Sequence, residues 1–246
     1  FVLAAGIGAL LALSAIQARA GSVELTPAAE VGMSAERLAR LRPILQKEVD
    51  DGLVAGIQVL VARNGKVVMH ENFGVADVES GEPLTDDSLF RIYSMTKPVT
   101  GVGMMLLYER GLFSLADPLA KHIPEFEGLK VYAGEDDDGN PVLVEPERPP
   151  TIHDLLQHTA GFTYGWFGDT YVDRRYVEIN VLDEDSSLQD MIDKLADIPL
   201  LYQPGTRWEY SVSVDIQGYL VEKLSGQDLE TFFREHIFEP LGMDET

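Results

Sequence analysis

Two residues with complementary chemistry, Ser94 and Lys97, stand three positions apart in the segment Ser94-Met95-Thr96-Lys97. Side chains at positions i and i+3 of a helix share one face, so Ser94 Oγ and Lys97 Nζ are expected to approach each other. The start of a helix adds partial positive charge and free N–H groups, which favour developing negative charge. We expect burial to lower the pKa of Lys97, so that its amine acts as a base. The pair therefore predicts attack by the Ser94 hydroxyl on a carbonyl group.

The segment that follows Lys97 supports this prediction. Ser-x-x-Lys occurs by chance in many helices, where the serine is an N-cap and the lysine is solvated. Here residues 99–107 are apolar or glycine at nearly every position. A helix that is hydrophobic on all sides belongs in the interior of a protein, where a solvated lysine is poorly accommodated. This setting favours a functional Lys97.

Several segments, taken in order, resemble the serine β-lactamases and penicillin-binding proteins. Ser94-x-x-Lys97 resembles the first motif of that superfamily, and the surrounding sequence is most similar to family VIII carboxylesterases and class C β-lactamase-like proteins. The resemblance covers about residues 30–246 and, as an ordered set of motifs, is far more specific than Ser-x-x-Lys alone. The segments that carry it are Phe90–Pro98, Thr151–Gly161, Gln203–Ser211 and Ile237–Met243.

The resemblance implies roles for three residues and a fold. Ser94 resembles the acylated nucleophile, Lys97 the general base, and Tyr210 the tyrosine that relays a proton to the leaving group. A phenol held near a lysine ammonium exchanges protons readily, because the cation lowers the tyrosine pKa. Chemistry of this kind needs no cofactor and no metal. The implied fold is α+β and β-lactamase/transpeptidase-like, an antiparallel sheet flanked by helices with a helical region built mainly from residues 94–225.

Two departures from the family pattern bear on the substrate and on the extent of the domain. The second motif reads Tyr210-Ser211-Val212, with valine where the family often has an asparagine that helps to hold a substrate amide. This favours esters over β-lactams. The third motif, Lys-Thr-Gly or a similar triplet on a sheet strand, has no match after Tyr210. We therefore expect residues 21–246 to be the N-terminal, incomplete part of a serine hydrolase domain, with its C-terminal sheet strands missing.

The predicted activity is hydrolysis of a small-molecule carboxylic ester through an acyl-enzyme on Ser94. Two alternatives keep the fold: a β-lactamase or D-alanyl-D-alanine carboxypeptidase, and a non-catalytic binding relative, which Val212 and the absent third motif favour. A third alternative is a metal-dependent hydrolase that uses His153, Asp154 and His158. Histidines five positions apart on a helix point about 140° apart, and no His-Glu-x-x-His pattern is present, so the sequence favours the serine hydrolase.

The elements that must position these residues follow from hydrophobic spacing and turn residues. Asn64-Gly65 predicts a hairpin, and its two strands alone would be marginal, so they are expected to join a larger sheet. The acidic run Asp136–Asn140 fits a hairpin turn better than a calcium loop, because it lacks alternating ligands and a distal glutamate. Strands are expected over Ile57–Val61, Lys66–His70 and within Lys130–Val144, and helices over Ser34–Gly52, Ser94–Gly111, Ile152–His158, Leu188–Ala196, Val214–Leu224 and Leu229–Ile237.

Overall composition narrows the function classes. The chain of 246 residues is 45% hydrophobic and 24% charged, as in an ordinary globular protein. Its 19 Lys and Arg residues against 41 Asp and Glu residues give a net charge of −22, which repels phosphate backbones and anionic lipid, so nucleic acid is not an expected partner. Cysteine is absent, so disulfides, thiolate metal sites and a cysteine nucleophile are excluded.

The first twenty residues resemble part of a secretory signal peptide. Residues 1–16 are almost wholly apolar, and Ala18-Arg19-Ala20 is a small-x-small triplet of the kind that precedes a cleavage site. An N-terminal membrane anchor is the alternative, although the run is short against the roughly 20 residues that span a bilayer. We expect export to the periplasm or cell exterior, with no stable membrane association after cleavage.

Overall fold

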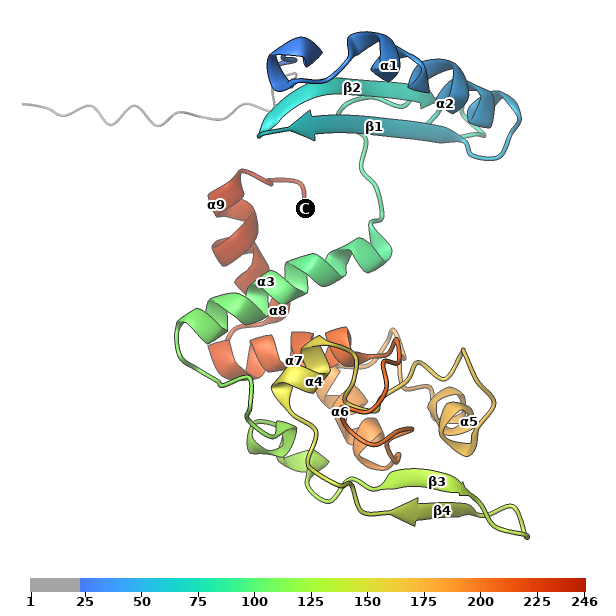
Figure 1. The fold of residues 1–246 in the computed structure, drawn as a ribbon, viewed down its shortest axis with the longest axis vertical. Helices are drawn as coiled ribbons and strands as arrows, with labels where there is room; N and C mark the ends of the chain where they lie inside the picture. Colours follow the sequence, from blue (N-terminus) through green and yellow to red (C-terminus); the bar gives the residue numbers. More distant parts are fainter. Residues whose placement is uncertain (1–22) are drawn as a thin grey trace, which may run out of the picture. The chain divides into compact units, whose positions relative to one another are not determined.

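The computed structural model describes residues 23–246, so the predicted signal segment lies outside the described residues. The chain divides into two compact units, the first ending at Arg91 and the second running from Ile92 to Thr246 (Figure 1). Ser94, Lys97 and Tyr210 all belong to the second unit.

The first unit is a β-hairpin covered on one face by helices. Its elements are η1 (Ala28–Val31), α1 (Ala35–Ala39), α2 (Leu41–Asp50), β1 (Gly56–Arg63) and β2 (Lys66–Gly74). Figure 1 shows α1 and α2 lying along one face of the antiparallel β1–β2 pair. Within the described residues this sheet has two strands. The predicted hairpin is confirmed.

Local residue chemistry explains the hairpin turn and the helix boundary. Asn64 and Gly65 have φ values of 53° and 72°, the left-handed pair that a tight turn between two twisted strands requires. The helix predicted from Ser34 is instead two helices that meet at Arg40. Pro43 lies in the first turn of α2. Proline has no N–H to donate to the carbonyl four residues earlier, so a continuous helix through this point would lose a hydrogen bond. Ser34 Oγ caps α1 by accepting a hydrogen bond from the Arg37 N–H at 3.3 Å.

The second unit is mainly helical, with one short antiparallel hairpin. Helix α7 lies against α3, α4 and α6 and supplies Ile216, Leu220 and Val221 to the core. The elements are η2 (Tyr93–Met95), α3 (Thr96–Glu109), η3 (Leu119–Lys121), η4 (Pro124–Phe126), β3 (Val131–Glu135), β4 (Pro141–Val144), α4 (Ile152–Leu156), α5 (Tyr171–Glu178), α6 (Leu188–Ala196), α7 (Ser213–Ser225), α8 (Leu229–Phe233), the π-helical turn η5 (Arg234–Phe238) and α9 (Glu239–Leu241).

Helix α3 differs from its prediction in two ways. It begins at Thr96, and Ser94 lies instead in the preceding 3-10 turn. The helix is also buried on one face, not on all sides: Met104 and Leu107 are fully buried, whereas Val102 and Met105 are 49% and 41% exposed. The buried face includes Gly103, where an added Cβ would lie 2.9 Å from the Phe233 ring, so the glycine permits close packing against α8.

The remaining predicted elements of the second unit are confirmed with small shifts in their ends. The β3–β4 turn is closed by Asp136, whose Oδ1 accepts hydrogen bonds from the Asp138 and Asn140 N–H groups at 3.0 and 2.8 Å. Helix α5 was not predicted, because its segment is short and strongly polar, although Val172, Tyr176 and Ile179 stand at helical spacing and pack in or against the core. Its start is fixed by a capping box between Thr170 and Asp173. No helix within residues 23–246 is long and apolar enough to cross a bilayer.

Candidate active site

Ser94 is presented by a strained turn at the start of α3. Tyr93 has φ of 43°, in the left-handed region that costs energy for any residue with a Cβ. Both Tyr93 and Ser94 are exposed, and the Met95 N–H closes the turn on the Ile92 carbonyl at 2.9 Å. The turn places Ser94 beside the N-terminal end of α3, which carries partial positive charge.

The structure brings together the three residues that the sequence singled out. Ser94 Oγ lies 3.0 Å from Tyr210 Oη, and Lys97 Nζ donates a hydrogen bond to Ser94 Oγ at 3.3 Å. Lys97 is on the first turn of α3, and Tyr210 is in the irregular segment that precedes α7. The serine hydroxyl therefore has two proton-exchanging groups within hydrogen-bond distance.

The environment of Lys97 differs from the prediction that burial lowers its pKa. Burial alone would lower the pKa of this half-buried amine, but the phenol groups of Tyr210 and Tyr164 outweigh burial and raise it. Lys97 Nζ is 4.8 Å from the centroid of the Tyr210 ring and 5.8 Å from that of Tyr164. In return, the Lys97 ammonium and the hydrogen bond with Ser94 lower the pKa of Tyr210. Lys97 is therefore the cation of the site, and Tyr210 is the group whose proton is more easily lost.

Aromatic rings surround the Tyr210 side chain. Tyr164 meets its ring edge-on at a centroid distance of 5.2 Å, and Trp208 stacks on it at 6.1 Å with an interplanar angle of 11°. Trp166 stacks on the Tyr164 ring, and Phe167 lies edge-on to it, so both extend the cluster. Tyr164 is buried, whereas Trp208 and Trp166 are 63% and 66% exposed. Sequence reasoning missed Tyr164, because nothing in its local sequence shows that it approaches Lys97.

The second motif contributes no amide to the site. Val212, which stands where the family often has asparagine, is fully buried in the core, and its N–H donates to the Thr163 carbonyl at 3.4 Å. Asp215, three residues further on, lies beside Lys97 in a cavity of about 210 Å³ that is lined also by Tyr93 and Thr100. Burial raises the pKa of the Asp215 carboxyl.

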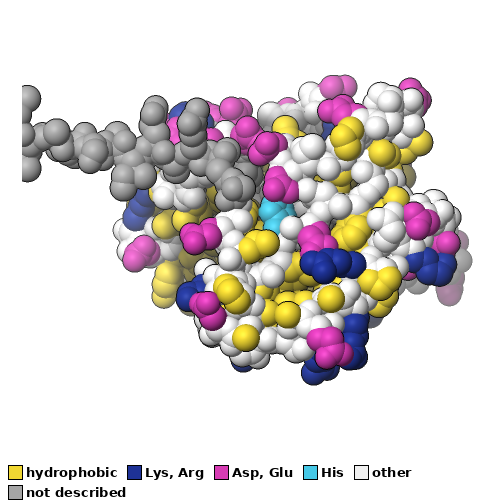
Figure 2. Space-filling model, turned by 90° about the horizontal axis from the view of Figure 1, so that it is seen from above, with side chains coloured by type: hydrophobic (Ala, Val, Ile, Leu, Met, Phe, Trp, Pro, Cys, Tyr) yellow, Lys and Arg dark blue, Asp and Glu magenta, His cyan; other side chains and the backbone are white. Residues whose placement is uncertain are grey.

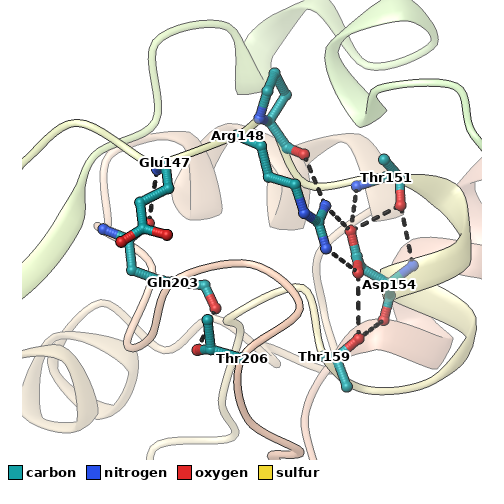
Figure 3. Close-up of polar contacts among 8 residues, drawn as sticks. Glu147, Arg148, Thr151, Asp154, Thr159, Gln203 and Thr206 are labelled. Carbon is teal, nitrogen blue, oxygen red and sulfur yellow. Dashed lines mark hydrogen bonds and ion pairs between the residues drawn. The ribbon is translucent and has the colours of Figure 1, made fainter.

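The residues of the metal alternative have other roles. Arg148 holds Asp154 by two hydrogen bonds of 2.6 and 2.7 Å, and Asp154 also completes the capping box of α4 with Thr151 (Figure 3). Burial alone would raise the pKa of Asp154, but Arg148 and Thr151 lower it to about 2. His153 is exposed, and His158 binds Ser211. In the part of the chain that the structure describes, no three His, Asp or Glu side chains are grouped to hold a metal ion.

The Asp154 network connects two loops that frame the site. The Thr159 N–H donates to the Asp154 carbonyl at 2.8 Å, and the Gly205 N–H donates to the Thr159 carbonyl at 2.7 Å. Gly205 has φ of 81°, and an added Cβ there would lie 2.0 Å from Arg148 Nη2. Figure 3 shows Gln203 and Thr206 of the same loop beside these residues. Gly205 thus permits the loop that leads to Tyr210 to lie close against the ion pair.

A larger cavity has none of Ser94, Lys97 and Tyr210 in its lining. It measures about 420 Å³ and is lined mostly by proline and other apolar residues, among them Pro118, Phe126 and Pro146. It contains no nucleophile beside a base, so its size alone does not make it the reactive site.

The chain is similar to several known proteins in sequence and in structure. The model of the family named Beta-lactamase matches residues 41–246. Esterase EstB of Burkholderia gladioli is 33% identical over 226 residues, covering 90% of this chain and 54% of that protein. Lovastatin esterase of Penicillium rubens is 31% identical over 204 residues, covering 82% of this chain and 50% of that protein.

Among solved structures, EstCE1, described as a hydrolase with promiscuous acyltransferase activity, aligns with a TM-score of 0.71 and 29% identity. The alignment covers 83% of this chain and 51% of that chain. The chain spans about half the length of the curated relatives it matches. The α+β, β-lactamase/transpeptidase-like fold expected from the sequence is confirmed. The family match over residues 41–246 and the identity with esterase EstB show that the chain belongs to the Beta-lactamase family.

Proposed function

We propose that this protein hydrolyses small carboxylic esters through an acyl-enzyme formed on Ser94. The observation that carries the proposal is the position of Ser94 Oγ, 3.0 Å from Tyr210 Oη and 3.3 Å from Lys97 Nζ. A serine with this arrangement has both a proton acceptor and a stabilising cation at hand. No cofactor enters the proposed reaction.

In the first half-reaction, Ser94 Oγ attacks the ester carbonyl carbon while its proton passes to Tyr210 Oη. Tyr210 is assigned this step because its pKa is lowered, whereas the pKa of Lys97 is raised and keeps it protonated. Tyr210 thus carries out both proton transfers, whereas the family resemblance implied Lys97 as the general base and Tyr210 as the relay to the leaving group. The carbon–oxygen bond to the alcohol then breaks, and Tyr210 returns the proton to the departing oxygen.

In the second half-reaction, a water molecule attacks the acyl carbon and gives its proton to Tyr210. The bond to Ser94 Oγ breaks, and Tyr210 reprotonates the serine, so that the acid is released and the site is restored. The positive end of α3 favours the negative charge that develops on the carbonyl oxygen in both tetrahedral intermediates.

The preference for esters has two supports. Two relatives with about one-third identity are named as esterases. The buried Val212 side chain provides no hydrogen-bond partner for a lactam or peptide amide.

Acyl transfer to an alcohol is the second candidate function, because the acyl-enzyme would be the same and EstCE1 is described as having that activity. The exposed rings of Trp208 and Trp166 offer apolar surface for the substrate.

The first test compares hydrolysis of p-nitrophenyl acetate and butyrate by the chain and by its Ser94→Ala variant. We expect hydrolysis that the variant lacks, and an intact-mass increase of the parent chain alone after treatment with a fluorophosphonate. A chromogenic cephalosporin and a D-alanyl-D-alanine peptide are expected to react far more slowly than the esters. Equal ester hydrolysis by the parent and the variant would contradict the assignment of Ser94. The chain spans about half the length of its relatives, so absence of labelling and of turnover would favour the non-catalytic relative only if it were also found for a protein extended to their full length.

We also propose that the protein is exported. The support is the apolar run of residues 1–16 followed by Ala18-Arg19-Ala20. N-terminal sequencing of the protein recovered from the periplasm or medium is expected to begin at Gly21. Recovery only from the cytoplasm, with residues 1–20 still attached, would contradict export.

A further inference from the structure

His158 contacts the chain on both sides of Tyr210. The Glu209 N–H donates to the His158 carbonyl oxygen at 2.8 Å, and the Ser211 N–H donates to His158 Nδ1 at 3.2 Å. The imidazole and phenol rings are also in contact, with centroids 5.2 Å apart. One residue therefore binds both neighbours of Tyr210 and packs against its ring.

Tyr210 depends on such contacts because its segment has no secondary structure of its own. Residues 207–211 belong to no helix or strand, so no ladder of backbone hydrogen bonds fixes them. The Thr206 N–H donates to the Gln203 carbonyl within the preceding turn, and the next backbone contacts with other segments are Gly205 with Thr159 and Val212 with Thr163. Between these, the backbone contacts of the segment are the two made with His158.

These contacts define the protonation state of His158. A backbone N–H can only donate, so Nδ1 must accept from Ser211 and carry no proton. The ring is then neutral, with its proton on Nε2. Ser211 Oγ lies 3.1 Å from Nδ1 and 2.7 Å from Ser213 Oγ, so it has a second partner. Protonation would turn Nδ1 into a donor that faces the Ser211 N–H donor, so the hydrogen bond between them would be lost.

The surroundings favour the neutral ring. Two effects lower the pKa of His158: burial, which is the larger, and the positive charge of Lys97 on α3. The other ionisable groups near it are Tyr210 and Glu209 in the segment that it holds, and Asp154 on α4, which is already paired with Arg148. A second cation here would lie close to the Lys97 ammonium.

We propose that His158 is a positioning residue for Tyr210 and that it acts only as the neutral Nε2–H tautomer. The inference rests on the proposed function, because it assigns His158 the task of holding Tyr210 Oη at 3.0 Å from Ser94 Oγ. Misplacing a reacting group by about 1 Å can cost on the order of 10²-fold in rate. His158 itself touches neither Ser94 nor the substrate carbonyl in this scheme.

The matched variants are His158→Ala and His158→Asn. Asparagine tolerates the left-handed backbone of His158, whose φ is 57°, and its Oδ1 can accept from the Ser211 N–H as Nδ1 does. We expect His158→Ala to lower kcat for p-nitrophenyl butyrate by on the order of 10²-fold with little change in KM, and His158→Asn to recover most of the loss. The exposed His153 provides the control, because His153→Ala leaves these contacts intact.

The pH profile separates positioning from general stabilisation. In the parent chain, log(kcat/KM) is expected to fall more steeply with decreasing pH once His158 also becomes protonated. In His158→Asn that extra ionisation is absent, so the slope stays that of Tyr210 alone. Equal loss of activity in both variants, or the same steep acid limb in His158→Asn, would overturn the proposal.

Nuclear magnetic resonance tests the inference without turnover. Long-range nitrogen–proton correlation of the imidazole of His158 in the inactive Ser94→Ala chain is expected to show a protonated Nε2 and an unprotonated Nδ1 at neutral pH. An Nδ1–H tautomer, or a charged ring, would refute the proposal even if ester hydrolysis is never detected. If the tautomer is as expected but no ester is cleaved by the parent chain, the proposed function fails and the contact with Tyr210 stands.

Discussion

At the scale of single residues, the site depends on which group holds the proton. Ser94, Lys97 and Tyr210 were predicted from the sequence, because the segments that contain them resemble motifs of a known family. Their electrostatics were not, since the pKa of Lys97 is set by Tyr164 and Tyr210, which approach it from distant parts of the chain. A local pattern shows that a lysine is present, but the balance between burial and neighbouring phenols requires the folded structure.

Removing the cation should move the pH profile in a defined direction. Lys97 lowers the pKa of Tyr210, so Lys97→Met is expected to raise it. Because the proposed base is the Tyr210 phenolate, the acid limb of kcat/KM should shift to higher pH. Tyr210→Phe serves as the control and should lose on the order of 10²–10⁴-fold in activity at all pH values. A limb that stays in place in Lys97→Met would show that Tyr210 is not the base.

The buried Asp154 carboxylate should make stability pH-dependent. Its pKa is lowered to about 2, so its contribution to the free energy of unfolding is present above its unfolded pKa near 3.8 and is lost as pH falls toward 2. Urea unfolding of the parent chain and Asp154→Asn, followed from pH 6 to pH 2, is expected to show curves that converge at the acid end. Parallel curves over that range would contradict the assignment.

At the scale of elements, those fixed by neighbouring residues were predicted more accurately than those that depend on contacts distant in the sequence. The Asn64-Gly65 hairpin was predicted correctly because the turn itself requires those residues. Helix α5 was missed because its apolar repeat of Val172, Tyr176 and Ile179 stands in a short segment that is otherwise polar and begins with a capping box. The start of α3 was misplaced by two residues, since the tightening into a 3-10 turn at Ser94 leaves no mark in the hydrophobic pattern.

The loop that leads to Tyr210 should be sensitive at Gly205. Any residue with a Cβ pays about 1–2 kcal/mol for a left-handed backbone, and at Gly205 the Cβ would also displace Arg148 from the buried Asp154. Gly128→Ala isolates the backbone cost, because Gly128 has φ of 79° with nothing within 4 Å of the added atom. We expect Gly205→Ala to destabilise the chain by at least about 2 kcal/mol more than Gly128→Ala in urea unfolding. Equal losses would mean that Arg148 moves aside without cost.

At the scale of the whole molecule, charge is the dominant feature. Acidic side chains are scattered over the face drawn in Figure 2, among fewer basic ones. This distribution accords with the net charge of −22. Self-repulsion of that size lowers the stability of a compact chain and is screened by salt.

Salt should therefore stabilise this protein. Raising NaCl from about 0.01 M to about 0.15 M shortens the Debye length from about 30 Å to about 8 Å. We expect the Tm at pH 7 to rise by about 2–4 °C, equivalent to about 1 kcal/mol. Near the isoelectric point of about 4.4 the same salt step should have little effect, because the net charge vanishes there. A rise of equal size at both pH values would point to a cause other than charge repulsion.

The left-handed backbone of Tyr93 has a consequence for directed evolution of this site. In a saturation library at position 93, activity would depend first on whether the new residue adopts a left-handed backbone and only then on the size of its side chain. The φ of 43° must be kept to present Ser94. Glycine, asparagine and aspartate would be retained among active clones, and β-branched valine and isoleucine would be lost. The side chain at position 93 lines the adjoining cavity and can be redesigned, but only among the few amino acids that accept a left-handed backbone.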